Sequence, residues 1–349
     1  MLEPKREESD TLSSRLPRAS RGAKRGISFS PRIWELSSLV VFVTFVAANF
    51  LSSALLSATE TKRPRILGIA HIQIYVTDVP AETEFFRTMM INEACSIERE
   101  SNQGPGPRFT GWCEWLPKNT FFVNALQTVG ISKMPQPVPT NLLQEITFAT
   151  DNVPELRRYL IAHGITPSKR QKPDLRLTVV DPDGHLIGFR QLDGPFPFSP
   201  WPAQMRLIHA GFIVHDRPAM ENFYRDILGF RPYWHGGRKD DGTDDWLDFQ
   251  VPDGTDWIEY MLNVPADASH KTLGVMNHIA LGVPDIKAAR EQLIKNGWKP
   301  GEEPKIGRGG KWQLNLYDPD DTRVEFMEFT PTQKPCCSEY TGPHPGPKQ

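Results

Sequence analysis

The sequence is poor in two features that would assign a protein to a class at once, cysteine and an excess of one charge. Its four cysteines show neither a CxxC spacing nor a disulfide framework, and we expect no structural role for the adjacent Cys336 and Cys337 in their polar tail. The formal net charge is −2, whereas a general nucleic-acid binder normally carries a basic stripe. A disulfide-stapled fold and a nucleic-acid partner are therefore not expected.

The sequence does have the length and apolar content for more than one packed unit. The chain has 349 residues, of which 39% are hydrophobic and 10% aromatic. Because this length exceeds that of a typical domain, we expect two units or one duplicated unit. Its 32 prolines gather in connecting stretches and in the tail. They mark these stretches as linkers.

One long apolar run lies near the N-terminus. Residues 1–35 are polar and basic, and we expect them to be disordered. Residues 36–58 carry no charge over 23 positions, which is long enough for a transmembrane or signal helix. The basic flank should stay in the cytoplasm. We therefore predict an exported protein, anchored in the inner membrane or released into the periplasm after cleavage, with a buried core helix as the alternative.

Four potential metal ligands stand at regular spacing in the last third of the chain, each in a short apolar run typical of a β-strand. They are His209, Glu259, His278 and Glu325. In each of two successive units, about 50 residues separate the histidine from the glutamate. A single such residue is usually solvated or hydrogen-bonded, but the repeat favours ligands. Imidazole and carboxylate together suit a divalent ion such as Zn, Ni, Mn or Fe.

The first half of the chain is repeated in the second half. The segment beginning at His71 aligns with the one beginning at His209 at a constant shift of 138 positions, with seven identical residues. Later segments match at shifts of 133 and 137 and keep their turns and apolar positions. Each half is in turn a pair of units with the order strand, helix and three strands. The pattern indicates an internal duplication in an α+β fold.

Only the second half keeps all the candidate ligands. His71 holds the place of His209, but the alignment puts Val123, Glu145 and Gly188 opposite the other three ligands in chain order. Valine and glycine cannot bind a metal. We therefore expect the first half to have a structural role, although a residual contact between His71 and Glu145 stays open.

The residues around the ligands resemble the vicinal oxygen chelate superfamily, which includes glyoxalase I, bleomycin resistance proteins and extradiol dioxygenases. The resemblance rests on the strands that begin at His209 and His278, on the helix end NFYRDILGF, and on the hairpin LYDPDDTRVEF with Glu325. It covers about residues 66–330. It implies four βαβββ modules in two tandem glyoxalase-like domains, in which two modules form a curved sheet around a metal.

The resulting division of the chain has six parts. They are a disordered basic segment (1–35), a transmembrane or signal segment (36–58), a first domain with a degenerate metal site (66–192), a Pro-rich linker (193–205), a second domain with the metal site (206–330) and a disordered tail (331–349).

The resemblance implies an enzyme that holds vicinal oxygens of a small substrate on one divalent ion. Four ligands are similar to glyoxalase I and related isomerases or lyases, in which Glu259 and Glu325 would also be catalytic. The alternative is an Fe(II) extradiol dioxygenase using His209, His278 and Glu325. Such enzymes carry a tyrosine shortly before the Asp-Pro turn, and Tyr317 is out of register for it. A non-catalytic ligand-binding protein is the third possibility.

Two Gly-rich loops precede core strands of the second domain, at residues 235–246 and 305–313. The second offers the side chains of Arg308, Lys311 and Trp312. Either the loops contact the substrate or they are solvated hairpin turns, and the sequence leaves both interpretations open.

Overall fold

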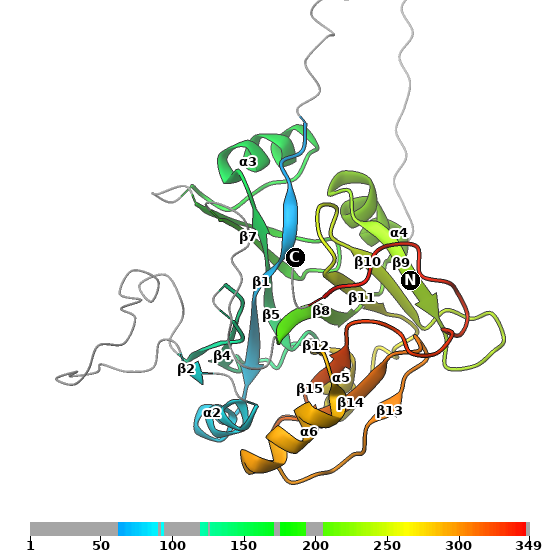
Figure 1. Cartoon of the computed structure of the whole chain (residues 1–349). Helices are drawn as coiled ribbons and strands as arrows, with labels where there is room; N and C mark the ends of the chain where they lie inside the picture. Colours follow the sequence, from blue (N-terminus) through cyan, green and yellow to red (C-terminus); the bar gives the residue numbers. More distant parts are fainter. Residues whose placement is uncertain are drawn as a thin grey trace, which may run out of the picture. The chain divides into compact units, whose positions relative to one another are not determined.

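The computed structural model describes residues 62–89, 92–93, 119–124, 126–170, 175–192 and 205–346. Residues 1–35, the apolar run 36–58 and residues 193–204 of the linker lie outside the described residues, so the predictions for them stay predictions. Within the described ranges, no helix is both long and apolar enough to span a membrane. Two curved β-sheets with short helices make up this part of the chain (Figure 1).

The first half forms a seven-stranded sheet in the order β2-β3-β4-β1-β5-β7-β6. Its central strands, β1 (Ile66–Val76) and β5 (Leu143–Thr150), are antiparallel, and each has a parallel neighbour on its other side. The other elements are α2 (Val79–Thr88), β2 (Asn92–Glu93), β3 (Thr120–Phe122), β4 (Thr128–Lys133), α3 (Val153–Ala162), β6 (Arg176–Val180) and β7 (Leu186–Gln191).

The second half forms an eight-stranded sheet in the order β13-β14-β15-β12-β8-β11-β10-β9. Its central strands, β8 (Arg206–Ile213) and β12 (His278–Val283), are again antiparallel with parallel outer neighbours. The other elements are α4 (Arg217–Glu221), the π-helical turn η2 (Asn222–Ile227), β9 (Arg231–Gly236), β10 (Trp246–Gln250), β11 (Trp257–Met261), α5 (His270–Met276), α6 (Ile286–Lys295), β13 (Lys305–Ile306), β14 (Trp312–Tyr317) and β15 (Arg323–Glu328).

The order of elements confirms a duplicated α+β fold made of two sheets of paired modules. Three modules have one strand, a helix and three further strands, as predicted. The second module, β5 to β7, has only two strands after its helix among the described residues. The difference is small, because the corresponding strand of the last module, β13, is only two residues long.

The helices of the four modules begin with the same kind of side-chain N-cap. Asp78, Asn152, Asp216 and Asp285 are the N-caps of α2, α3, α4 and α6, and each side chain accepts a backbone hydrogen bond from the first turn. These contacts satisfy N–H groups that have no partner inside the helix. Proline follows in the first turn of three of the four helices, where its missing N–H costs nothing.

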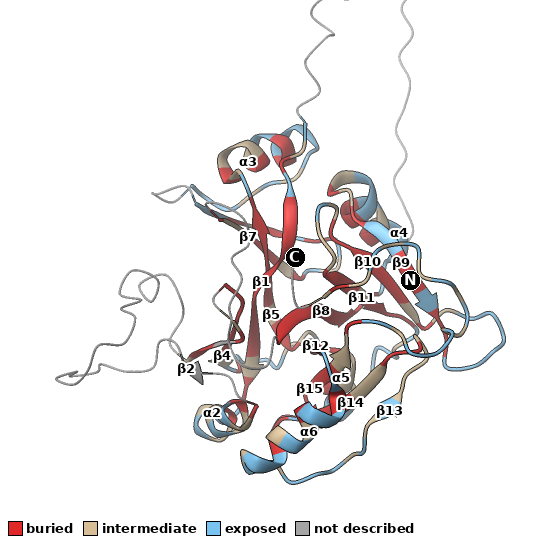
Figure 2. Ribbon diagram, viewed as in Figure 1, coloured by how far each residue is buried: buried red, intermediate tan, exposed pale blue. Residues whose placement is uncertain are grey.

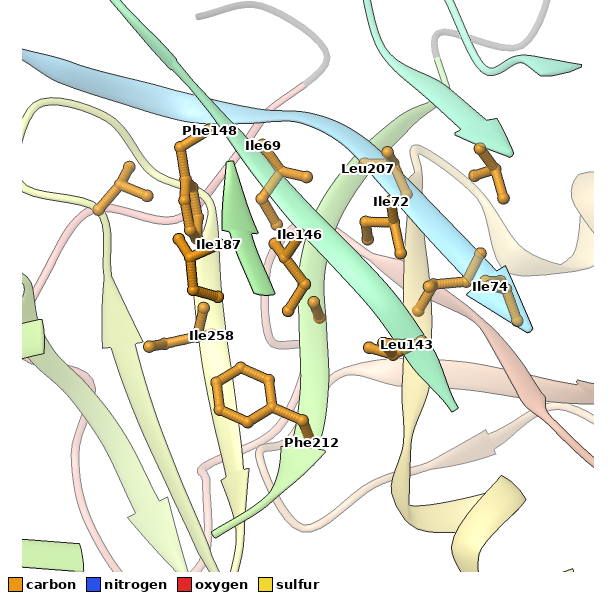
Figure 3. Close-up of a cluster of buried hydrophobic side chains, with 14 of the residues drawn as sticks. Ile69, Ile72, Ile74, Leu143, Ile146, Phe148, Ile187, Leu207, Phe212 and Ile258 are labelled. Carbon is orange, nitrogen blue, oxygen red and sulfur yellow. The ribbon is translucent and has the colours of Figure 1, made fainter. Parts of the chain in front are cut away.

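The central strands are buried, and one hydrophobic core joins the two sheets. β8 and β12 are buried at every position, and β1 at all but one (Figure 2). A single cluster includes side chains from β1, β5 and β7 of the first sheet and from β8 and β11 of the second (Figure 3). Strands covered on both faces become continuous apolar runs, which explains the poor alternation of polar residues in these segments.

Buried polar contacts also connect the halves. The Gln127 amide nitrogen donates to the carbonyls of Ile69 (2.8 Å) and Leu207 (2.9 Å), and its oxygen accepts from the Leu207 N–H at 2.9 Å. The Asp256 carboxylate accepts from the Ile69 N–H at 2.9 Å and pairs with Arg206. These contacts satisfy backbone groups of β1 and β8 that the two sheets leave unpaired.

Residues 331–346 lie on the second sheet, which corrects the prediction of a disordered tail for this stretch. The Thr341 N–H donates to the Tyr233 carbonyl at 3.0 Å. The rings of Tyr340 and Tyr233 have centroids 4.8 Å apart. The polar, Pro-rich sequence gave no periodic signal because the segment is held by contacts with distant strands and not by a helix or strand of its own.

Cys336 and Cys337 form a disulfide within this segment, contrary to the expectation that they have no structural role. The Cys336 carbonyl accepts a hydrogen bond from the Trp234 indole at 3.2 Å. The pair therefore lies against β9, beside the loop that carries Arg308.

Candidate metal centre

Four adjacent strands each bring one predicted ligand to one face of the second sheet. β8 supplies His209 and, two residues further along the same face, Gly211. His278 of β12 and Glu259 of β11 are the cross-strand partners of Gly211 on its two sides, and Glu325 stands on β15 next to β12. A Cβ atom at Gly211 would fall 1.9 Å from His278 Cε1. Glycine therefore leaves the space that the imidazole ring needs.

The donor atoms of the four side chains converge. His209 Nε2 is 3.1 Å from His278 Nε2, 3.6 Å from Glu325 Oε2 and 3.9 Å from Glu259 Oε2. His278 Nε2 is 3.0 Å from Glu259 Oε2 and 3.9 Å from Glu325 Oε2. The structure thus brings together all four residues that the sequence suggested as ligands.

This donor set fits a divalent metal ion. His278 Nδ1 lies 3.1 Å from the Met276 carbonyl, which assigns the N–H to Nδ1 and the free lone pair to Nε2. His209 Nδ1 is buried and has no hydrogen-bond partner among the described residues. The donor atoms of His209, His278 and Glu325 all lie within 4.8 Å of one another, and Glu259 Oε2 adjoins this group through His278 Nε2. Imidazole and carboxylate are ligand types that Zn, Ni, Mn or Fe accept, and six-coordinate geometry leaves room for a substrate.

The local charges hold these donors in the forms that metal binding requires. Burial alone would raise the pKa of Glu325, but its hydrogen bond with His209 and the charge of Arg323 outweigh burial and lower that pKa to about 2. Burial also opposes ionisation of Glu259, whose pKa is nevertheless lowered by a hydrogen bond and charge from His278. Burial and then Arg323 lower the pKa of His278. Ionised carboxylates and a neutral His278 at neutral pH are the ligand forms of a metal site.

A cavity of about 480 Å³ opens beside the donors, a size within the usual range for small-molecule sites. Aromatic side chains form part of its wall: Trp234, Trp246, Trp257 and Tyr340. Cationic side chains also line it: Lys305, Arg308, Arg323 and Lys334. The cavity therefore has flat apolar surfaces and positive charge close to the carboxylates of Glu259 and Glu325. Gln333, Lys334, Cys336 and Tyr340 of the C-terminal segment also line it.

The two Gly-rich loops differ in their relation to this cavity. Residues 305–310 and Gln313 line it, which supports substrate contact by the second loop. Of the first loop, residues 235–246, only Trp246 lines the cavity. The guanidinium carbon of Arg238, in that loop, lies 5.5 Å from the centroid of the Trp246 ring. The first loop therefore contributes only the indole ring of Trp246 to the cavity wall.

Lys311, suggested as a substrate contact, is buried behind the aromatic wall. Its Nζ lies 4.6 Å from the Trp257 ring centroid and 5.1 Å from that of Tyr340, and it donates to the Tyr233 hydroxyl at 3.3 Å. Burial lowers the pKa of Lys311 to about 7, although Asp248 favours the charged form. Lys311 thus links β9, β11 and the C-terminal segment behind the site.

Two polar residues of the cavity were missed in the sequence, Asp248 and Arg323. Asp248 is the cross-strand partner of Glu259, is buried, and has no partner for Oδ1 among the described residues. Burial, then the charge of Glu259, raises its pKa well above the usual range, which favours the protonated carboxyl. The signal that could have found Asp248 is an acidic residue inside the apolar strand WLDFQ.

The strand register corrects one position in the comparison of the two halves. The parallel ladder β1–β4 corresponds to β8–β11, and it places Gly130 at the counterpart of Glu259, where the alignment had placed Val123. The error arose because the chain between these strands is longer in the first half. Glu145 and Gly188 do occupy the predicted places opposite His278 and Glu325.

Comparison with known proteins gives a family match for part of the chain. Residues 206–326 match the family model described as Glyoxalase/Bleomycin resistance protein/Dioxygenase superfamily. The chain is 28% identical over 138 residues to the probable chloroplastic lactoylglutathione lyase of Arabidopsis thaliana, covering 38% of this chain and only 38% of that relative. It is 29% identical over 132 residues to the lactoylglutathione lyase of Haemophilus influenzae, covering 37% of this chain and 96% of the relative.

Solved structures with the same fold are extradiol dioxygenases. The 2,3-dioxygenase LapB from Pseudomonas sp. KL28 superposes with a TM-score of 0.53 at 14% identity, over 82% of this chain and 96% of that one. Homoprotocatechuate 2,3-dioxygenase from Brevibacterium fuscum, in complex with 3,4-dihydroxyphenylacetate, gives a TM-score of 0.53 at 17% identity over 81% and 84%. At such identities the likeness concerns the fold. The match to the Glyoxalase/Bleomycin resistance protein/Dioxygenase family model thus concerns residues 206–326, the second half of the duplicated fold.

Proposed function

We propose that the protein is a divalent-metal-dependent enzyme of the isomerase or lyase type, similar to glyoxalase, acting on a small molecule with two neighbouring oxygens. The observation that carries the proposal is the position of Glu259, whose Oε2 lies 3.0 Å from His278 Nε2 and completes a set of four donors. The similarity to two lactoylglutathione lyases supports the same class of reaction.

The side chains around the cavity suggest how the reaction would proceed. His209, Glu259, His278 and Glu325 would hold the ion, which would polarise the substrate oxygens and acidify a neighbouring C–H bond. The Glu259 side chain is 15% exposed, against 4% for Glu325, so Glu259 is the more accessible base. It would take the proton from carbon and return it to the adjacent carbon, with no net oxidation. Asp248 also lines the cavity, and its raised pKa favours the protonated form that would donate a hydrogen bond to a substrate oxygen.

An Fe(II) extradiol dioxygenase is the second candidate. His209, His278 and Glu325 have donor atoms that all lie within 4.8 Å of one another, and this triad suits such an enzyme. Tyr317 weakens the candidate, because its hydroxyl donates to Glu302 at 3.1 Å and the side chain does not line the cavity. A binding protein without catalysis would need no converging set of buried donors.

Substitution of Glu259 separates these candidates. In protein loaded with Zn(II) or Ni(II), we expect solvent-deuterium exchange into α-hydroxyketones, followed by NMR, to fall about 100-fold or more in Glu259→Ala, because the base is lost. Glu303→Ala, a control at an exposed glutamate outside the cavity lining, should leave exchange unchanged. Oxygen uptake with catechols by Fe(II)-loaded protein that survives Glu259→Ala, without any exchange activity, would replace the proposal with the dioxygenase.

The place of the enzyme in the cell is also a proposal. The uncharged residues 36–58 and their basic flank support export with an N-terminus left in the cytoplasm. A reporter that is active only outside the cytoplasm, fused after Thr330 of the full-length chain, would stay inactive if the chain is not exported.

A further inference from the structure

Arg323 is the cation closest to the converging donors. It is the first residue of β15, the cross-strand partner of His278, and stands two residues before Glu325 on the same face. Its Nη2 lies 2.7 Å from His278 Nε2 and 3.9 Å from Glu259 Oε2. Its side chain is 15% exposed and lines the cavity. Its Nε is buried and has no hydrogen-bond partner among the described residues.

The lone pair that Arg323 uses is the one that a metal ion would need. His278 Nδ1 carries the N–H that faces the Met276 carbonyl, so Nε2 has a single lone pair to offer. That lone pair cannot accept from Arg323 and coordinate an ion together. When His278 serves the ion, the guanidinium loses its nearest acceptor while remaining at the cavity wall. Arginine has five donors and no acceptor, so it then needs an oxygen from elsewhere.

The other cations of the cavity already have carboxylate partners away from the metal donors. Lys305 pairs with Glu302 at 3.2 Å, Arg308 pairs with Asp240, and Lys334 pairs with Glu339 at 3.5 Å. Lys305 and Lys334 are also largely exposed, where water weakens an ion pair. Among the cationic side chains that line the cavity in the described ranges, Arg323 alone has only metal-binding candidates as partners.

The balance of charge around Arg323 favours an anion. The carboxylates of Glu259 and Glu325 neutralise the two charges of a divalent ion, so that Glu259 no longer balances the charge of the guanidinium. A guanidinium binds a carboxylate through two parallel hydrogen bonds, which also orients the bound molecule. The indole and phenol rings that line the same cavity offer flat apolar surfaces for the rest of the molecule.

We propose that Arg323 is the anion-binding residue of this site and that the substrate is a small anion with a flat, apolar body. Its negatively charged oxygen binds Arg323 beside the oxygens that the ion takes. The inference rests on the proposed metal-dependent function, and it adds to that function the charge and the shape of the substrate.

Mandelate and mandelamide form a matched pair of probes for this proposal. Both offer a hydroxyl and a carbonyl oxygen on adjacent carbons and a phenyl ring, and they differ by an anionic oxygen in place of a neutral amide. Binding to the full-length, metal-loaded chain is measured by titration calorimetry, with quenching of the cavity tryptophans as a second readout. We expect wild-type protein to bind mandelate at least 10-fold more tightly than mandelamide.

Variants of Arg323 assign this preference to the guanidinium. Arg323→Gln should abolish the preference for mandelate, and Arg323→Lys should restore part of it. The matched control is Arg217→Gln, an arginine that is paired with Glu221 and lies outside the cavity lining, which should keep the preference. Arg323→Gln should also bind Zn(II) several-fold more tightly than wild type, because the competitor for His278 Nε2 is gone.

The outcomes separate this inference from the function on which it rests. Protein that takes up no ion would overturn the metal-dependent function. If the protein takes up one ion but the wild type shows no preference for mandelate over mandelamide, the role of Arg323 alone is overturned. The same holds if Arg323→Gln keeps the preference. Wild-type protein that binds neither probe counts as showing no preference. Weaker Zn(II) binding in Arg323→Gln would show that the arginine positions His278 as a ligand, which also contradicts the proposal.

Discussion

The two halves of the molecule have the same strand order around their central pair, but different chemistry at equivalent positions. In the first half, His71 Nδ1 lies 2.8 Å from Thr128 Oγ1, and its Nε2 lies 3.0 Å from Gln73 Oε1. Both ring nitrogens are therefore occupied within the protein, and burial lowers the pKa of His71 to about 4, which keeps the ring neutral. In the second half, His209 Nδ1 has no hydrogen-bond partner in the part of the chain that the structure describes, and its Nε2 lies 3.1 Å from His278 Nε2.

The carboxylates of the two halves differ in the same way. Glu145, in the place of His278, accepts from Arg176 Nη2 at 2.6 Å and from Thr147 Oγ1 at 2.6 Å. Its charge is thus matched within the first sheet, whereas Glu259 and Glu325 of the second sheet face two imidazoles. The backbone alone does not make a metal site. A metal site needs lone pairs that the protein does not use itself.

A glycine decides which arrangement is possible. The first half has Gln73 where the second half has Gly211, as both are the register partners of the His278 position. The Gln73 side chain fills the space over Gly130, where a Cβ would fall 2.1 Å from its Oε1. In the first half, the hydrogen-bonded Gln73 side chain therefore occupies the space that a carboxylate at the position of Gly130 would need.

The largest expected effect follows from removing the imidazoles of one half. The double variant His209→Ala/His278→Ala should lose the single equivalent of divalent metal that we expect in wild type, because two carboxylates alone bind such an ion weakly. Elemental analysis of the purified chain measures the content. His71→Ala is the matched control in the first half and should keep one equivalent; loss of metal in that variant would place an ion there instead.

The next effect tests the glycine. Gly211→Ala places a methyl group in the space of the His278 ring and should weaken metal binding about 10-fold or more, measured by competition with a chelating dye. Gln73→Ala at the equivalent place should leave the metal affinity unchanged. Equal metal affinity in wild type and Gly211→Ala, with the fold intact by circular dichroism, would show that Gly211 is not needed for the donor geometry.

The smallest expected effect concerns a helix that the two halves build differently. Glu82 of α2 is fully buried against the hairpin that carries Asp318, and Met220 of α4 occupies the corresponding position in the second half. Burial first, then the charges of Asp318 and Asp320, raises the pKa of Glu82 to about 10. The folded state therefore keeps a proton that the unfolded chain loses near pH 4.5. Stability from this group is complete below pH 4.5 and is lost progressively as pH rises toward 10.

Replacing Glu82 by methionine, the residue at the corresponding position of the second half, should remove this loss of stability at high pH. Glu82→Met should raise the free energy of unfolding by about 1–3 kcal/mol at pH 8 and flatten its dependence on pH between 5 and 9, measured by urea denaturation. Glu84→Gln is the control on the same helix, since the Glu84 side chain is 73% exposed. An unchanged pH profile in Glu82→Met would mean that the carboxyl ionises without cost in the fold.

The resemblance of residues 206–326 and the four side chains that come together were accessible from the sequence because both depend on local pattern. Apolar strands that carry a His or a Glu and recur at a fixed interval reveal a duplication without any knowledge of contacts. The same pattern placed Glu145 and Gly188 correctly opposite their counterparts, because the segments between the strands have similar lengths. It failed at Gly130, because the two halves differ in length before that strand and counting residues cannot detect a change of register.

Other features were decided by the tertiary structure alone. No motif of the sequence assigned a role to Asp248 or Arg323, and they reach the metal donors only because β10 pairs with β11 and β15 pairs with β12. The C-terminal segment has the composition of a disordered tail, yet Tyr340 helps to close the cavity because distant strands offer it ring contacts and backbone partners. Local sequence thus determined the strands and the ligands they carry, whereas the neighbours of those ligands depended on which distant strands paired, since pairing is set by the packing of the whole domain.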